Sequence, residues 1–62
     1  MEGAEDYLTA VAFAADAVAG HAAAIHAGRE PDPDGDRIDQ WINHYAGATG
    51  TSPDDIRTAL NH

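Results

Sequence analysis

YLTAVAFAADAVAGHAAAIHAG, residues 7–28, is the stretch that decides the fold of this chain. It is rich in alanine and carries one formal charge, at Asp16. Because alanine is the strongest helix former, we predict a helix over about residues 4–27. A helix that is apolar on nearly every side must be covered on nearly every side. A chain of 62 residues forms one small domain, 1–62, and has little material for that cover.

The larger apolar side chains of this helix recur at steps of three and four residues. Such spacing places them on one face within an arc of about 100° and predicts a seam that packs against the rest of the chain. The seam consists of Leu8, Val11, Ala15, Val18, Ala22 and Ile25. The predicted solvent face lies roughly opposite and consists of Glu5, Thr9, Ala12, Asp16 and Ala23.

Phe13 belongs to neither of these faces, since it points about 140° or more from most of the seam. Its neighbours on the helix are small, so another helix could approach closely with Phe13 as a knob. Two interpretations stay open: a helix of the same chain folds back over this side, or a second chain covers it. The predicted partner-binding residues are Ala10, Phe13, Ala17, Gly20 and Ala24.

Two shorter helices follow a linker at residues 30–35 that is rich in proline and aspartate. We predict the second helix over about 36–46, with Asp34 or Asp36 as its cap, and expect Gly47 and Gly50 to end it. The third should span about 53–60, with Ser52 at the N-cap and Pro53 as its first residue. The apolar residues of both are Ile38, Trp41, Ile42, Tyr45, Ile56 and Leu60.

These elements predict an all-α fold in which one long N-terminal helix is packed by two short helices in a small bundle. The helices would be about 36, 17 and 12 Å long. Two short helices laid end to end could line the seam of the long one, which leaves the side of Phe13 uncovered. We therefore expect self-association or a partner chain to complete the bundle.

The charge balance narrows the choice of partner. Eleven carboxylates face three arginines, there is no lysine, and the net charge is −8. Direct nucleic-acid binding and attachment to an anionic membrane are disfavoured, because both depend on lysine and arginine. A basic protein would be attracted. The acidity is equally consistent with a solubility feature of a salt-adapted protein.

Residues 8–25 are long enough to span a membrane, but ten of these eighteen residues are alanine or glycine. Asp16 and His21 lie inside the segment, and no lysine or arginine precedes it. The first charged residues are acidic, unlike those of a secretion signal. We predict a soluble, cytoplasmic protein with no membrane contact.

The sequence offers few groups for catalysis or for a metal. There is no cysteine or lysine, and the single serine is better explained as a helix cap than as a nucleophile. Asp32, Asp34 and Asp36 alternate as in the calcium loop of an EF-hand, but the turn glycine and the bidentate glutamate of that motif are missing. His21 and His26 are five residues apart and do not form a ligand pair. We predict no enzyme activity, no cofactor and no metal.

Two functional hypotheses remain. The first is a non-catalytic protein-binding module that acts through the alanine-rich helix as an oligomerisation, small-subunit or adaptor domain. The alternative is a small acidic inhibitor or nucleic-acid mimic, of the phage-type anti-defence class, that occupies a basic groove of a nucleic-acid-handling protein. The acidic surface in that case would consist of Asp32, Asp34, Asp36, Asp39, Asp54 and Asp55.

Overall fold

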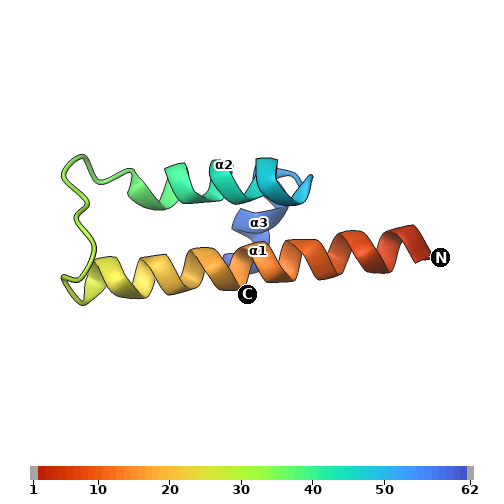
Figure 1. Cartoon of the computed structure of the whole chain (residues 1–62), viewed down its shortest axis with the longest axis horizontal. Coiled ribbons are helices and arrows are strands. Elements are labelled where there is room, and N and C mark those ends of the chain that lie inside the picture. The colour runs from red at the N-terminus through yellow and green to blue at the C-terminus, as the bar shows by residue number, and fades with distance from the viewer. Residues whose placement is uncertain (1, 62) are drawn as a thin grey trace.

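The computed structural model describes residues 2–61, which form three helices and no strand. They are α1 (Glu2–His26), α2 (Arg37–Thr49) and α3 (Pro53–Leu60). In Figure 1, α2 runs back along α1 in the opposite direction, and the N-terminal end of α1 extends beyond both shorter helices. The shape is elongated, with extents of 41 × 17 × 16 Å. The predicted all-α bundle of one long and two short helices is confirmed.

The core lies at the middle of α1, where both short helices reach it. Ala14, Val18 and Ile56 are fully buried, and Ile42 is almost so. α2 and α3 also contact each other, so they share one core instead of lying end to end along α1. The remaining core residues are Val11, Ala15 and Ala46.

The predicted seam of α1 is correct at its centre and wrong at its start. Val11, Ala15 and Val18 are buried, but Leu8 remains 66% exposed. Leu8 lies beside α3 in a hollow that Val11, Thr58 and Ala59 also line, and the small side chains of α3 leave it largely uncovered. Ala14, which the seam left out, is fully buried instead.

The end of α1 follows the expected glycine cap. Gly28 has a φ of 77°, a left-handed conformation that suits glycine. The N–H of Arg29 donates to the carbonyl of Ala24 at 2.8 Å, and the N–H of Gly28 donates to that of Ile25 at 3.1 Å. These bonds use carbonyls of the last turn that would otherwise lack partners.

The second helix is longer than predicted and is capped by a different residue. It continues through Gly47 to Thr49, and only Gly50, with a φ of 70°, ends it. Asp36 occupies the N-cap position without making a side-chain cap bond. Asp32 replaces it, since its Oδ1 accepts the N–H of Arg37 at 3.0 Å. The linker thus folds back to start α2.

The third helix has the predicted bounds, with Pro53 in its first turn. Ser52 has the extended backbone of an N-cap residue but makes no side-chain cap bond. Instead its N–H donates to the hydroxyl of Tyr7 at 3.0 Å. The same hydroxyl donates to Oδ2 of Asp55, so Tyr7 of α1 joins the start of α3.

Candidate protein-binding surfaces

The side of α1 that carries Phe13 is not covered by the described part of the chain. Phe13 is 63% exposed and lies outside the core cluster. We call this surface the Phe13 face. Among its small residues Gly20 is exposed and the alanines are half-buried. Of the two interpretations, cover by a helix of the same chain is not found among the described residues, and cover by a second chain stays a prediction. The face consists of Ala10, Phe13, Ala17, Gly20 and Ala24.

Gly20 has no structural explanation within the chain. Glycine in a helix interior costs about 1 kcal/mol relative to alanine. A Cβ built at Gly20 would meet no neighbouring atom within 4 Å among the described residues. The backbone of α1 is therefore bare at this point of the Phe13 face, and a second helix could approach it closely.

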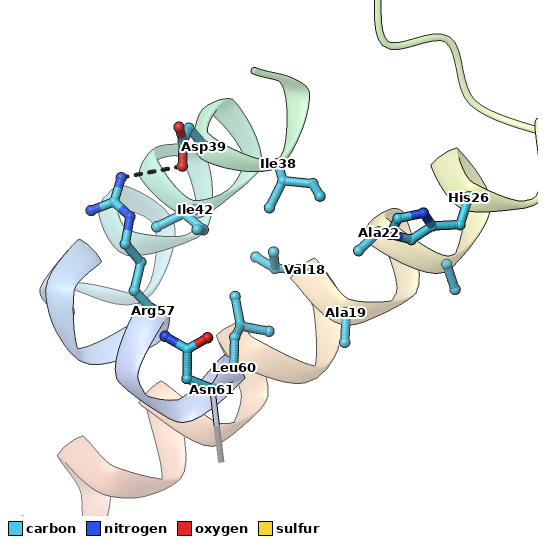
Figure 2. Close-up of a pocket in the computed structure, with 11 residues that line it drawn as sticks. Val18, Ala19, Ala22, His26, Ile38, Asp39, Ile42, Arg57, Leu60 and Asn61 are labelled. Carbon is cyan, nitrogen blue, oxygen red and sulfur yellow. Dashed lines mark hydrogen bonds and ion pairs between the residues drawn. The ribbon is translucent and has the colours of Figure 1, made fainter. Parts of the chain in front are cut away.

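A groove of about 690 Å³ runs between the three helices on another side of α1 (Figure 2). Val18 and Ala22 of α1 face Ile38 and Ile42 of α2 across it, and Leu60 of α3 closes one end. The apolar pattern of these residues predicts direct packing of the short helices against α1, not a groove. α3 has only eight residues and is too short to cover the last turns of α1. The short length expected for the third helix could have indicated that part of α1 would stay uncovered.

The rim of this groove is polar. Arg57 Nη2 lies 3.4 Å from Asp39 Oδ1 across the gap between α3 and α2. Arg57 Nη1 lies equally far from Asp54 Oδ1 in its own helix. His26 and Asn61 are the other polar lining residues. An apolar floor with a charged rim is typical of a surface that binds another polypeptide.

Four side chains from α1, the linker and α2 form a bonded cluster near the end of α1. His21 Nδ1 lies 2.8 Å from Glu30 Oε1, and the indole N–H of Trp41 donates to Glu30 Oε2 at 2.6 Å. His21 stacks on Trp41 with ring centroids 3.7 Å apart and planes 10° apart. The hydroxyl of Tyr45 lies 3.4 Å from His21 Nε2. We call this the His21 cluster.

The His21 cluster was not predicted, because Glu30 was assigned only to the linker. The signal was Trp41, whose indole N–H requires an acceptor once the ring is partly buried. The hydrogen bonds from His21 and Trp41 lower the pKa of Glu30 below its usual range. The polar groups of the cluster are hydrogen-bonded to one another. We interpret the cluster as a structural contact that holds the linker against α1 and α2.

The six aspartates proposed as an acidic surface do not form one patch of free carboxylates. Asp32 accepts the Arg37 N–H, Asp36 accepts from Gln40, and Asp55 accepts from Tyr7. Asp39 and Asp54 are the two partners of Arg57. Of these six aspartates, only Asp34 lacks such a bond among the described residues. Over the same residues, no three histidine or acidic side chains are grouped closely enough to hold a metal ion.

The segment Glu5–His26 of α1 is long and apolar enough to cross a membrane by length and composition, and 22% of its most apolar window is buried. Soluble core helices and signal sequences have the same property.

The chain matches no protein-family model, no curated protein and no solved structure. Function must therefore be inferred from these surfaces themselves.

Proposed function

We propose that this chain is a non-catalytic protein-binding module whose Phe13 face packs against a helix of another polypeptide chain. The module would serve as an oligomerisation, small-subunit or adaptor domain. The observation that carries the proposal is the 63% exposure of Phe13 in the middle of a face of small residues. A large aromatic ring surrounded by alanine and glycine has the form of a knob that packs into a hole on a neighbouring helix. Within the described chain no helix provides that hole.

The free energy available from this face is substantial for so small a domain. Full burial of a phenylalanine side chain stabilises a complex by about 1.5–3 kcal/mol. Close approach at Gly20 and the neighbouring alanines adds dispersion contacts along both backbones. While these residues are exposed to solvent, they contribute neither of these stabilising terms. A role in association therefore accounts for residues that contribute little to the fold.

The acidic inhibitor remains the alternative, with the partner being a basic protein. Its carboxylates are mostly at the surface, but five of the six already have partners within the chain. Binding by that route would weaken steeply as salt rises, and neutralising Asp34 would reduce it. Binding through the Phe13 face would respond weakly to both changes, so the two functions can be separated.

Photo-crosslinking from two adjacent positions tests the proposal directly. A benzophenone amino acid replaces Phe13 in one variant and, in the matched control, Ala12, which is exposed and lies about 100° around the helix from Phe13. Both are expressed in cells that make the protein and are irradiated there. We expect a crosslink to a defined polypeptide from position 13 and little from position 12. Equal crosslinking at both positions, or none at 13, would contradict the proposed function.

A further inference from the structure

We infer that the occupant of the Phe13 face is a second copy of this chain, with the two α1 helices antiparallel and their two-fold axis at Ala17. This inference rests on the proposed function and specifies its partner. It is supported by three features of α1: the distribution of charge along it, the order of large and small residues on the Phe13 face, and the bare backbone at Gly20.

The first turns of α1 are acidic, and an arginine follows the end of the helix, next to Glu30, whose carboxylate is already bonded to His21 and Trp41. Glu5 and Asp6 lie exposed near its start, and Asp6 is seven residues before Phe13 and hence on the same side of the helix. No carboxylate occurs between Asp16 and Glu30, whereas Arg29 lies exposed just after the helix end. Antiparallel pairing places the acidic end of each copy beside the partner's Arg29. Parallel pairing would place Glu5 and Asp6 beside the same residues of the partner.

The order of residues on the Phe13 face fits the same arrangement. With the axis at Ala17, Ala10 of one copy lies opposite the partner's Ala24, and Ala17 lies opposite the partner's Ala17. Phe13 then points into the space bounded by the partner's Ala17, Gly20 and Ala24. Each copy thus provides one knob and one hole, as a two-fold interface requires. The same register brings Asp6 opposite the partner's Gly28, next to Arg29.

The register also explains Gly20. In the single chain its missing side chain leaves open space. In the pair, that space receives the partner's Phe13 ring, which a Cβ at position 20 would displace. Two long helices pair along their length, each with its own α2 alongside, and the result is a four-helix bundle of common type.

Disulfide trapping measures the direction of pairing, because the chain contains no cysteine of its own. Ala10→Cys and Ala24→Cys chains, one carrying a mass tag, are mixed and oxidised. Antiparallel pairing predicts the mixed 10–24 disulfide as the main product. Parallel pairing predicts 10–10 and 24–24 disulfides instead. Ala12→Cys, on the solvent face, is the control and should oxidise much more slowly than the mixture.

Charge reversal measures the register independently of cysteine chemistry. Asp6→Arg should weaken self-association about two- to five-fold, and adding Arg29→Asp should restore it. Circular dichroism of each variant verifies that the helices are intact. Loss of association in the double variant as well, with helicity retained, would overturn the proposed register.

Failure of the inference can be told apart from failure of the proposed function. Homodisulfides as the main product, or a photo-crosslink from position 13 to a different protein, would overturn the antiparallel self-pair and leave the binding function standing. Absence of any crosslink from position 13 would remove both. Co-sedimentation with phosphatidylcholine vesicles that is lost in Phe13→Asp would also overturn the inference, since the occupant would then be lipid.

Discussion

The two sides of α1 have similar residues and different surroundings. On the covered side Ala14 and Val18 are fully buried, because α2 and α3 bring Ile42 and Ile56 against them. On the Phe13 face the small residues recur, but no helix of the described chain lies over them, and Phe13 is 63% exposed. Small residues thus pack against other helices on the covered side of α1, while those of the Phe13 face contact no other helix of the described chain.

This comparison shows what alanine and glycine contribute in such a helix. On the covered side they let the short helices approach the backbone of α1, and those helices provide the larger side chains. On the Phe13 face α1 itself provides the large side chain, while the small residues leave room for one. A surface of that form suits the proposed pairing, in which a second copy of the chain completes it.

The largest expected difference between the two sides comes from truncating one large side chain on each. Ile56→Ala should lower the free energy of unfolding by about 2–5 kcal/mol, because Ile56 is fully buried. Phe13→Ala should change the monomer's stability by less than about 1 kcal/mol, since most of its ring is exposed. Urea denaturation of dilute samples, followed by circular dichroism, measures both values. Similar losses in the two variants would contradict the comparison.

Enlarging a small residue tests the difference between the two sides of α1 in a second way. Ala14→Leu should destabilise the fold by about 1–3 kcal/mol, because a fully buried alanine leaves no room for a leucine. Ala12→Leu is the matched control on the same helix, and its exposed position should make it nearly neutral. The measurement is again the urea midpoint, and a neutral Ala14→Leu would show that the core around α1 is loosely packed.

Gly20→Ala should move folding and association in opposite directions. The variant should stabilise the monomer by about 1 kcal/mol through helix propensity. It should also weaken self-association, because the new methyl group occupies the space assigned to the partner's Phe13. Thermal denaturation at low concentration measures the first effect, and sedimentation equilibrium measures the second. Stronger association in Gly20→Ala would count against close contact at this residue.

The His21 cluster predicts a loss of stability in acid. The pKa of Glu30 is lowered in the folded chain, so its charged form stabilises the fold above the ordinary glutamate pKa of 4.5. That contribution disappears as the pH falls below 4.5 and through the lowered pKa. Glu30→Gln should therefore be less stable than the wild type at neutral pH, and the difference should shrink in acid. Thermal midpoints at a series of pH values test this, and a constant difference would contradict it.

Tyr7→Phe should have the smallest effect of this series, because the hydroxyl lies at an exposed site. Its bond to Asp55 raises the pKa of Tyr7, so the bond stabilises the fold below the ordinary tyrosine pKa of 10 and is lost as the pH rises above it. The variant should be slightly less stable than the wild type at neutral pH. The two should converge in alkali. Amide exchange at Ser52, faster in the variant, is the direct readout.

Much of the fold could be predicted because its signals are local. Alanine content, the glycine at 28 and the serine–proline start of α3 predict the three helices. The angular position of Phe13 places it off the seam but leaves open whether the same chain covers it. The exposure of Leu8 could not be predicted in this way. It depends on which side chains of α3 lie beside Leu8, and that is set by tertiary packing.

The candidate sites also differ in whether local sequence signals or tertiary packing define them. The Phe13 face is a property of one helix and can be found from helical periodicity. The groove and the His21 cluster need the relative positions of α1, the linker and α2, which the periodicity does not give. Asp32, not Asp34 or Asp36, caps α2 for the same reason, since the linker's path decides which carboxylate reaches the N–H of Arg37.

The most direct test of self-pairing is the molar mass in solution, measured by size-exclusion chromatography with light scattering over a concentration series at low and high salt. We predict approach to about 13 kDa, twice the 6.5 kDa of one chain, at both salt concentrations. Phe13→Asp and Ala17→Glu should remain at the mass of one chain while Asp34→Asn behaves as the wild type. A folded wild-type chain that stays at 6.5 kDa throughout would contradict the pairing of α1 with a second copy.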